Sequence, residues 1–487
     1  MRILNKNRIT RHGNEVGRRI VADLLDVGLD SIDPYNRVKS LLSRNGNVLR
    51  IRSDGFTMTG DPHTEDIVLD LDDFDRIFVI GAAKGVQRAG IAFEDVLGDR
   101  LTGGHLIAKH GEPVICKKIG VTLAGHPVPD EDSVKGCEEI ERIAKTLTEK
   151  DLVFTVTGSG VSSLMTYPVD GVTLKDIADF TRMMQIEKGV PTSDLNPIRT
   201  HLDKFKGGRL SRLLRPARLI HLTTADPSKK NTPAERFSYY EFLKINTFLP
   251  TIANGYTFAD CIKILEKWDA VSETPKAILD RLYNGRREDE NMSIEEFDAS
   301  GDRFFGLIFK NATIYPAVRK RAEEYGLKCV MLSEYVEAEA REAAKVDASI
   351  ALNIERTGEP FKAPIVLMSS GENVVTVGKE RGVGGRNQEY CLQAAVNISG
   401  SRKVVMGAVD TDGTDGPGGF CFEGAPSCLA GAIVDGYTLQ KAKESGIDIS
   451  SALKTHGTSE PLWKLDCGVS ATANVSALDL RVILVME

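Results

Sequence analysis

The chain has 487 residues, more than one hydrophobic core usually supports, so its length favours two or three domains. Hydrophobic residues make up 41% and charged residues 27%, an ordinary globular mixture that excludes a disordered, collagenous or membrane-embedded chain. The formal net charge of −7 and the lack of a long Lys/Arg run give no electrostatic reason to expect nucleic acid or anionic lipid as a partner.

The chain shows no sign of export or of a bound transition metal. Its N-terminal segment is basic but lacks the apolar core of a signal peptide, and no later segment has the length of a membrane span. The eight cysteines are scattered without a CxxC pair, and the eight histidines show no HExxH spacing. We therefore expect a cytoplasmic protein with buried free thiols.

The first part of the chain predicts helices followed by a parallel sheet. Apolar residues between Val21 and Leu29 fall near one helical face, and strands are expected at Arg76–Ile80, Gly104–Ala108 and Leu152–Val156. Two strands run into a glycine turn and then a helix, which indicates βαβ winding and a Rossmann-like, mainly parallel sheet. Ligands of such sheets bind at the carboxyl ends of the strands.

Composition changes further along the chain suggest additional domains. Residues 231–362 are more helical and more charged, and we expect a mixed helical continuation with a surface insertion there. From Ala363 a new set of strands is expected in the segments PIVLMSS, NVVTVG, RKVVMGAVD and DLRVILVM. The predicted organisation is a Rossmann-like domain over 1–230, the helical part over 231–362, and a smaller α/β domain over 363–487.

The first glycine turn carries a lysine. The strand ending at Ile80 runs into Gly81-Ala82-Ala83-Lys84-Gly85, where a helix N-terminus offers free backbone N–H groups. The Lys84 ammonium could neutralise phosphate or carboxylate charge there. The alternative is a tight turn with a solvated lysine, since the motif is neither Walker A nor GxGxxG.

The second glycine turn adds hydroxyl groups. Gly158, Ser159, Gly160 and Ser162 offer small residues, free N–H groups and side-chain oxygens that suit an anion. A glycine turn that only permits close packing of strand and helix is the alternative. Further on, the segment Leu195–Leu210 concentrates cations beside a Gly-Gly pair, and its lone His201 is expected to be structural rather than a base.

The last domain carries an arginine in a loop rich in glycine. Gly384 and Gly385 precede Arg386 and Asn387 at the expected start of a helix, where the backbone can approach a ligand closely. A guanidinium suits bidentate binding of phosphate or carboxylate. The alternative is a surface pair of Arg386 with Glu389, which would not explain the glycines.

Carboxylates follow the expected strand that ends near Ala408. The segment DTDGTDGP contains Asp412 and Asp415, which could hold Mg²⁺ or take a proton from a substrate hydroxyl. A calcium loop of the EF-hand type lacks its required glutamate here. An Asp/Gly-rich turn without a ligand is the remaining alternative.

The motifs VIGAAKG, HPVPDEDS, LNPIRTHLDKFKGGRL, GVGGRNQE, DTDGTDGP and AGAIVDGYT together resemble the glycerate 2-kinase family, whose C-terminal part is called the MOFRL domain. The resemblance implies a Rossmann-like domain and a smaller α/β domain across a cleft. It also implies transfer of phosphate from ATP, with Mg²⁺, to the 2-hydroxyl of D-glycerate. The chain is similar to this family as a divergent member.

The resemblance assigns roles to particular residues. It implies Lys84, Arg386 and Asp412 as catalytic residues, and Asp412, Asp415 and Asp226 as metal ligands. The nucleotide would contact the glycine turns and the start of the C-terminal helix, through Gly81, Gly158, Ser159, Gly160, Ser162, Gly384, Gly385 and Asn387.

Several turns depart from the family pattern. The SGGGSALL turn contains Ser159 and Val161 in place of glycines, and because the β-branched Val161 disfavours positive φ, we expect another loop shape. The SDVxGD motif is reduced to Thr223–Pro227, with Asp226 as the counterpart of an acid, and GPTGTNV has become Val469–Val475.

Because of these departures, three functions stay open. They are a kinase acting on glycerate or a closely related sugar acid, an NAD-dependent hydroxypyruvate reductase, and a catalytically silent relative that binds ligand. The reductase lacks a GxGxxG motif in this sequence. In each case the partners are a small hydroxy acid and a nucleotide, and the chain is a monomer or homodimer.

Overall fold

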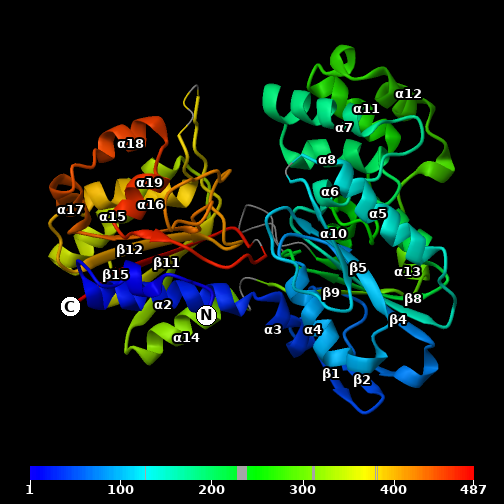
Figure 1. Cartoon of the computed structure of the whole chain (residues 1–487), viewed down its shortest axis with the longest axis horizontal. Coiled ribbons are helices and arrows are strands. Elements are labelled where there is room, and N and C mark those ends of the chain that lie inside the picture. The colour runs from blue at the N-terminus through cyan, green and yellow to red at the C-terminus, as the bar shows by residue number, and fades with distance from the viewer. Residues whose placement is uncertain (127, 228–237, 310–312, 379, 381, 476) are drawn as a thin grey trace. The chain divides into compact units, whose positions relative to one another are not determined.

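The computed structural model describes residues 1–126, 128–227, 238–309, 313–378, 380, 382–475 and 477–487. The chain forms two compact units, which are coloured along the sequence in Figure 1. The N-terminal unit comprises Pro34–Lys229 and Arg236–Phe309, and the C-terminal unit comprises Met1–Asp33 and Lys310–Glu487.

The N-terminal unit contains a six-stranded sheet in the order β6-β5-β4-β7-β8-β9, in which every neighbouring pair is parallel. The prediction of a Rossmann-like, mainly parallel sheet is therefore confirmed. A second, antiparallel sheet of three strands lies in the same unit. The strands are β1 (Leu42–Asn45), β2 (Val48–Ile51), β3 (Ile67–Asp70), β4 (Arg76–Ala82), β5 (Gly103–Lys109), β6 (Gly120–Ala124), β7 (Asp151–Thr157), β8 (Arg218–Thr223) and β9 (Arg303–Gly306).

Helices of the N-terminal unit cover the sheet and form a separate apolar cluster. In Figure 1, α7, α8, α11 and α12 gather at one end of this unit, and their buried apolar side chains make one cluster. The helices are α3 (Pro34–Leu41), α4 (Gln87–Leu97), α5 (Glu131–Ala144), α6 (Val161–Leu164), α7 (Leu174–Thr181), α8 (Thr192–His201), α9 (Arg209–Leu214), α10 (Tyr239–Ile245), α11 (Phe258–Lys267), α12 (Lys276–Asn284) and α13 (Ile294–Ala299).

The C-terminal unit is built on a mixed six-stranded sheet in the order β10-β11-β15-β12-β13-β14. Only β10 and β11 pair in parallel within it. Its strands are β10 (Lys328–Val336), β11 (Ile365–Gly371), β12 (Val404–Asp410), β13 (Gly431–Asp435), β14 (Gly468–Val469) and β15 (Asp479–Val485). Its helices are α1 (Lys6–Ile9), α2 (Glu15–Ser31), α14 (Ile314–Glu324), α15 (Ala340–Thr357), α16 (Arg386–Asn397), α17 (Thr438–Glu444), α18 (Ile449–Thr455) and α19 (Ser459–Lys464).

The helix α2, near the N-terminus of the chain, packs with the sheet of the C-terminal unit. The apolar face expected between Val21 and Leu29 exists in α2, but it contacts β12, where a Cβ on Gly407 would lie 2.7 Å from Val21 Cγ1. A buried ion pair, 2.5 Å between Arg18 Nε and Asp435 Oδ2, joins the same helix to the end of β13. The first 33 residues thus belong to the C-terminal unit by packing, which an apolar helical face alone does not reveal.

The prediction of a strand at NVVTVG is wrong. Residues 373–378 form a loop after β11, with only an isolated bridge between Val374 and Glu339. Val375 and Val377 line a pocket, while Val374 is half exposed, so the apolar residues here have no strand neighbours to pack against.

The segment 231–362, expected as one helical part, is divided between the two units, because β10, α14 and α15 join the C-terminal unit.

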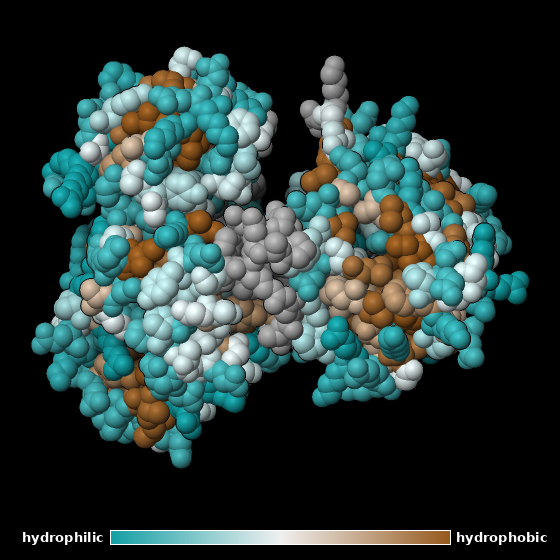
Figure 2. All heavy atoms as spheres, turned by 180° about the vertical axis from the view of Figure 1, so that it is seen from behind, coloured by the Kyte–Doolittle hydropathy of each residue, from teal (hydrophilic) through white to brown (hydrophobic). Residues whose placement is uncertain are grey.

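The helices, the surface and the cysteines can be compared with the expectations from composition. Among the residues that the structure describes, none of the helices combines the length and the apolar character that a membrane span requires. Figure 2 shows hydrophilic and hydrophobic side chains interspersed on the visible face of both units. All eight cysteines are free thiols, and five of them are buried: Cys137, Cys261, Cys329, Cys391 and Cys467.

Candidate active site

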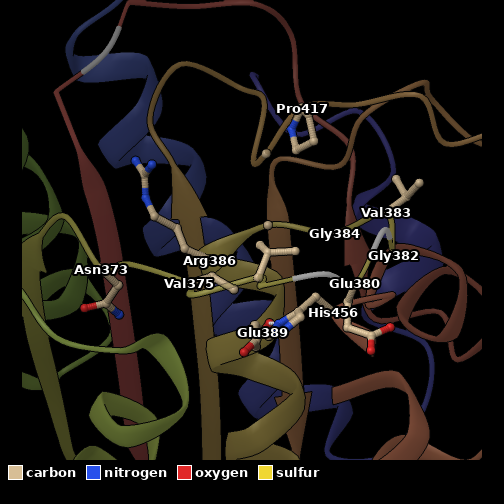
Figure 3. Close-up of a pocket in the computed structure, with 13 residues that line it drawn as sticks. Asn373, Val375, Glu380, Gly382, Val383, Gly384, Arg386, Glu389, Pro417 and His456 are labelled. Atoms are coloured by element: carbon tan, nitrogen blue, oxygen red, sulfur yellow. Dashed lines mark hydrogen bonds and ion pairs between the residues drawn. The ribbon is translucent and has the colours of Figure 1, made fainter. Parts of the chain in front are cut away.

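A pocket of about 460 Å³ lies in the C-terminal unit, beside the start of α16 and the loop that follows β11 (Figure 3). Its walls combine valines and a proline with an arginine and a buried acid–imidazole pair. The lining residues are Asn373, Val375, Val377, Glu380, Gly382, Val383, Gly384, Gly385, Arg386, Glu389, Gly416, Pro417 and His456.

Arg386, the first residue of α16, bridges the ends of two strands. Its Nη2 donates to Asp410 Oδ2 at 2.8 Å, and its Nε donates to Asp479 Oδ1 at 2.8 Å. Asp410 and Asp479 are register partners at the ends of β12 and β15. Burial opposes the charge of the guanidinium, but Asp479 and Asp410 outweigh it and raise the pKa of Arg386. The guanidinium is thus charged and held in one orientation.

The carboxylates around Arg386 carry more negative charge than one guanidinium can balance. Burial raises the pKa of Asp410 well above its usual range, the charges of Asp412 and Asp479 raise it further, and Arg386 opposes them. Asp410 Oδ1 accepts from the Asp412 amide at 3.1 Å, so the two acids lie side by side. Carboxylate oxygens that lie close together and repel one another are suited to binding a divalent cation such as Mg²⁺.

Asp415 caps the N-terminus of α16. Its Oδ1 accepts from the amide and the side chain of Asn387, both at 3.1 Å, and its Oδ2 accepts from the Gln388 amide at 2.9 Å. These bonds satisfy N–H groups that a helix N-terminus otherwise leaves without partners. Burial raises the pKa of Asp415 to about 6. The oxygens that we expected to hold a metal are engaged with the helix.

The glycines before Arg386 have a packing reason. A Cβ on Gly385 would lie 2.2 Å from the Asp415 carbonyl oxygen, and one on Gly384 would lie 2.3 Å from Thr458 Oγ1. Only glycine lets this loop pass so close to its neighbours. Asn387, expected to contact the cofactor, donates to Asp415 and, at 2.8 Å, to Asp479 Oδ1.

The alternative of an Arg386–Glu389 surface pair is wrong. Glu389 is buried, and its carboxylate lies 2.8 Å from His456 Nδ1 and 2.9 Å from Arg341 Nε. In Figure 3, Glu389 and His456 lie together in the pocket, and Arg386 points away from them.

Sequence reasoning missed Asp479, Asn373 and the Glu389–His456 pair. The side chain of Asn373 is buried, and neither of its amide atoms has a hydrogen-bond partner among the described residues. Its backbone N–H donates to Asp479 Oδ2 at 3.2 Å. Their positions could have indicated these residues, because Asp479 begins a buried strand and Asn373 closely follows another, and ligands bind at strand ends.

The two glycine turns of the N-terminal unit come together because β4 and β7 are neighbours. The Lys84 amide donates to the Ser159 carbonyl at 3.0 Å. Gly160 has φ +87°, and a Cβ there would lie 3.2 Å from Lys84 Cγ and 3.1 Å from His126 Cδ2. The left-handed residue is therefore Gly160, Val161 begins α6, and Lys84 and His126 lie at this turn.

The other residues predicted for these turns have packing roles and hydroxyl neighbours. A Cβ on Gly81 would lie 1.8 Å from the Val156 carbonyl oxygen, and one on Gly158 would lie 1.9 Å from Thr224 Oγ1. The hydroxyls of Thr224 and Thr157 are buried and lack partners within the described chain. Ser162 lies in α6 and Asp226 follows β8, both partly buried.

Comparison with known proteins agrees with the fold. A family described as a domain of unknown function (DUF4147) matches residues 20–283, and the MOFRL family matches residues 365–474. A glycerate 2-kinase of Pyrococcus horikoshii is 30% identical over 451 residues, 93% of this chain and 92% of that protein. A putative hydroxypyruvate reductase of Agrobacterium vitis is 31% identical over 412 residues, 84% of this chain and 99% of that protein.

The crystal structure of a glycerate kinase from Thermotoga maritima superposes with a TM-score of 0.74 at 25% identity, covering 97% of this chain and 100% of that one. Fold and relatives together define a phosphotransferase with an alcohol group as acceptor. Within that class, the chain belongs to the glycerate 2-kinase family. The resemblance stated from the sequence motifs is confirmed.

Proposed function

We propose that this chain transfers a phosphoryl group from ATP, with Mg²⁺, to the 2-hydroxyl of D-glycerate or of a closely related small sugar acid. The observation that supports this best is that Arg386 bridges Asp410 and Asp479 at the adjacent ends of β12 and β15. Phosphoryl transfer depends mainly on positioning and on charge neutralisation, and an oriented guanidinium beside carboxylates supplies both.

Arg386 has an edge that a phosphate can take. Its Nη1 lies 3.4 Å from Glu372 Oε1, and the Glu372 side chain is 52% exposed. Such an exposed, long ion pair contributes little, so phosphate oxygens can displace it while Asp410 and Asp479 keep the guanidinium in place. In this proposal Arg386 binds the transferred group.

The metal ligands in this proposal are Asp410 and Asp412, while Asp415 orients α16. When bound, Mg²⁺ neutralises phosphate charge and relieves the repulsion between these buried acids. Asp412 lies in the turn directly after β12, and its Oδ1 accepts from the Thr414 amide at 2.8 Å, which fixes the side chain. Asp226, predicted as a further ligand, stays a proposal for the N-terminal unit.

The N-terminal unit contributes an anion cradle in this proposal. Lys84 supplies the charge, and Gly81, Gly158, Ser159, Gly160 and Ser162 form the turns around it. The buried hydroxyls of Thr157 and Thr224 are further donors for an oxyanion.

The test is release of ADP in a coupled assay with a panel of small sugar acids, at saturating Mg²⁺. We expect turnover with D-glycerate or a near relative. Oxidation of NADH by hydroxypyruvate without ADP release would support the reductase instead. Binding of nucleotide and acid without either reaction would identify a silent relative.

A further inference from the structure

A buried arginine of the N-terminal unit has no carboxylate partner among the residues that the structure describes. Arg199 lies in α8 and is 6% exposed. Its Nε and Nη2 both donate to the Thr181 hydroxyl, at 3.3 and 3.1 Å. Within the described residues these are the only polar contacts of its guanidinium, and the acceptor is a single neutral oxygen.

Two other cations of the same unit, the buried Lys206 and the partly buried Arg209, have complete polar contacts. Lys206 Nζ lies 2.5 Å from Asp203 Oδ2 and also donates to the Met165 carbonyl at 2.6 Å. Arg209 donates from Nη1 and Nη2 to backbone carbonyls, at 2.9 Å in the case of Thr200. Arg199 is as buried as Lys206 and more buried than Arg209, and it differs from both in its polar contacts.

The burial of Arg199 is uncompensated. Desolvation lowers the pKa of its guanidinium to about 10, and no charged group of the described chain offsets this. The group remains protonated at neutral pH, so it cannot escape the cost of burial by losing its proton. A buried charge of this kind is stable only when an opposite charge and further hydrogen bonds satisfy it.

A π-helical turn follows the residue that Arg199 contacts. Directly after Thr181 the chain continues as a π-helix, Arg182–Glu187, and π-helical turns occur frequently at functional sites. The α8 residues Leu195–His201 are all buried, so the helix that carries Arg199 is fixed on every side. The position of the arginine side chain is thus fixed by its helix.

A second polar group of α8 also lacks a partner. Asn196 precedes Arg199 by one helical turn, so both lie on neighbouring positions of one helix face. Its Oδ1 is buried and makes no hydrogen bond within the described chain. A guanidinium fork matches a planar oxyanion, and an amide beside it matches a hydroxyl, which together are the groups of a small hydroxy acid.

We propose that Arg199 binds an oxyanion of the reactants, either the carboxylate of the hydroxy acid or a phosphate group of the nucleotide. The anion site itself does not depend on the proposed function. Only the identity of the ligand as a hydroxy acid or nucleotide rests on it.

The test is thermal melting in chloride buffer, with separate additions of D-glycerate, inorganic phosphate and MgATP. Arg199→Met keeps length and apolar stem but removes the charge. We expect the wild type to melt higher with the anion that it binds, and the rise to be clearly smaller in Arg199→Met, in which the other proposed binding residues remain. Without added anion, Arg199→Met should melt no lower than the wild type, because an unpaired buried charge has been removed.

Arg209→Met is the control, since it removes a partly buried arginine of the same unit whose contacts are complete. It should lower the melting temperature and keep the anion-induced rise. If Arg199→Met does not fold, Arg199→Lys carries the same test, because it keeps the charge but lacks the fork and should keep only part of the rise.

Steady-state kinetics identify the source of the oxyanion. Arg199→Met should raise the KM for the acid by about 10- to 100-fold if the carboxylate binds there, and the KM for ATP by that factor if a phosphate does. Equal destabilisation of Arg199→Met and Arg209→Met, with the anion-induced rise intact in both, would overturn the proposal. If the melting temperature rises with an anion only when Arg199 is present, but the chain shows no turnover, the anion site is supported and the proposed kinase function is contradicted.

Discussion

Arg386 Nε and Asp479 Oδ1 lie 2.8 Å apart although 93 positions separate the two residues in the chain. Asp479 also accepts from Asn387 Nδ2, so one carboxylate positions two consecutive residues of α16. The orientation of the guanidinium is therefore decided by the first residue of the last strand, together with Asp410 on the neighbouring strand.

Arg386→Lys should lower kcat by about 100-fold or more, the usual cost of losing an oriented donor to a transferred group. A lysine keeps the charge but cannot bridge Asp410 and Asp479 as a fork does. Steady-state rates with ATP and the best acid measure this. Arg8→Lys in the same unit is the control, because Arg8 pairs with the partly exposed Asp466 and should keep its activity. Full activity of Arg386→Lys would show that the contacts of Arg386 with Asp410 and Asp479 serve structure and not catalysis.

Asp412→Asn should raise the Mg²⁺ concentration needed for half-maximal rate by about 10-fold or more, since a neutral amide oxygen binds Mg²⁺ more weakly than a carboxylate oxygen. Asp415→Asn should leave that concentration nearly unchanged and instead lower stability, because Asp415 caps α16. Rates over a Mg²⁺ titration and melting curves separate the two effects. The reverse pattern would exchange the roles of these acids.

Asp415 predicts a pH dependence of stability. The pKa of this buried acid is raised to about 6 in the folded chain, above its usual value near 4. The folded state then binds more protons than the unfolded state between about pH 4 and 6, so the free energy of unfolding falls as pH rises through this window. The fall attributable to Asp415 is about 3 kcal/mol, at 1.36 kcal/mol for each pKa unit.

Urea unfolding at pH 4.5, 5.5 and 7 measures this contribution. Asp415→Asn cannot titrate, so the difference in stability between wild type and variant should shrink as pH rises through the window. A difference that stays constant with pH would show that Asp415 titrates normally.

Gly160→Ala should lower activity more than Gly171→Ala. Both glycines have φ +87°, so both substitutions impose the same backbone strain. Only at Gly160 would the new methyl group press on Lys84 and His126, whereas Gly171 has no atom within 4 Å of that position. Equal kcat values for both variants, at matched melting temperatures, would argue against a role of this turn.

Lys84→Ala should lower kcat by about 100-fold and leave the melting temperature nearly unchanged, if its ammonium binds an oxyanion. Lys84→Arg keeps the charge and should retain part of the activity. Circular dichroism and melting curves check the fold. Wild-type rates for Lys84→Ala would make this lysine a surface residue of the turn.

Local patterns predicted six of the fifteen strands in the described chain and failed where contacts with neighbouring segments decide the structure. Strands around β4, β7, β12 and β15 were found because buried apolar runs bounded by turns are distinctive. The segment 373–378 has the same apolar character but lies in a loop, because its valines face a pocket or solvent and not adjacent strands.

The sequence by itself determined the family and the parallel winding of the first sheet, and it predicted Lys84, Arg386 and the acids after β12 as candidate site residues. These follow from short motifs whose residue types and spacing are local properties of the chain. The tertiary structure decided which acids surround Arg386, that Asp415 caps a helix, and that α2 packs with the last sheet. It also decided that Arg199 is buried with no carboxylate beside it in the described part of the chain. Each of these depends on contacts between distant segments, and burial changes the energy of a charge far more than its position in the sequence does.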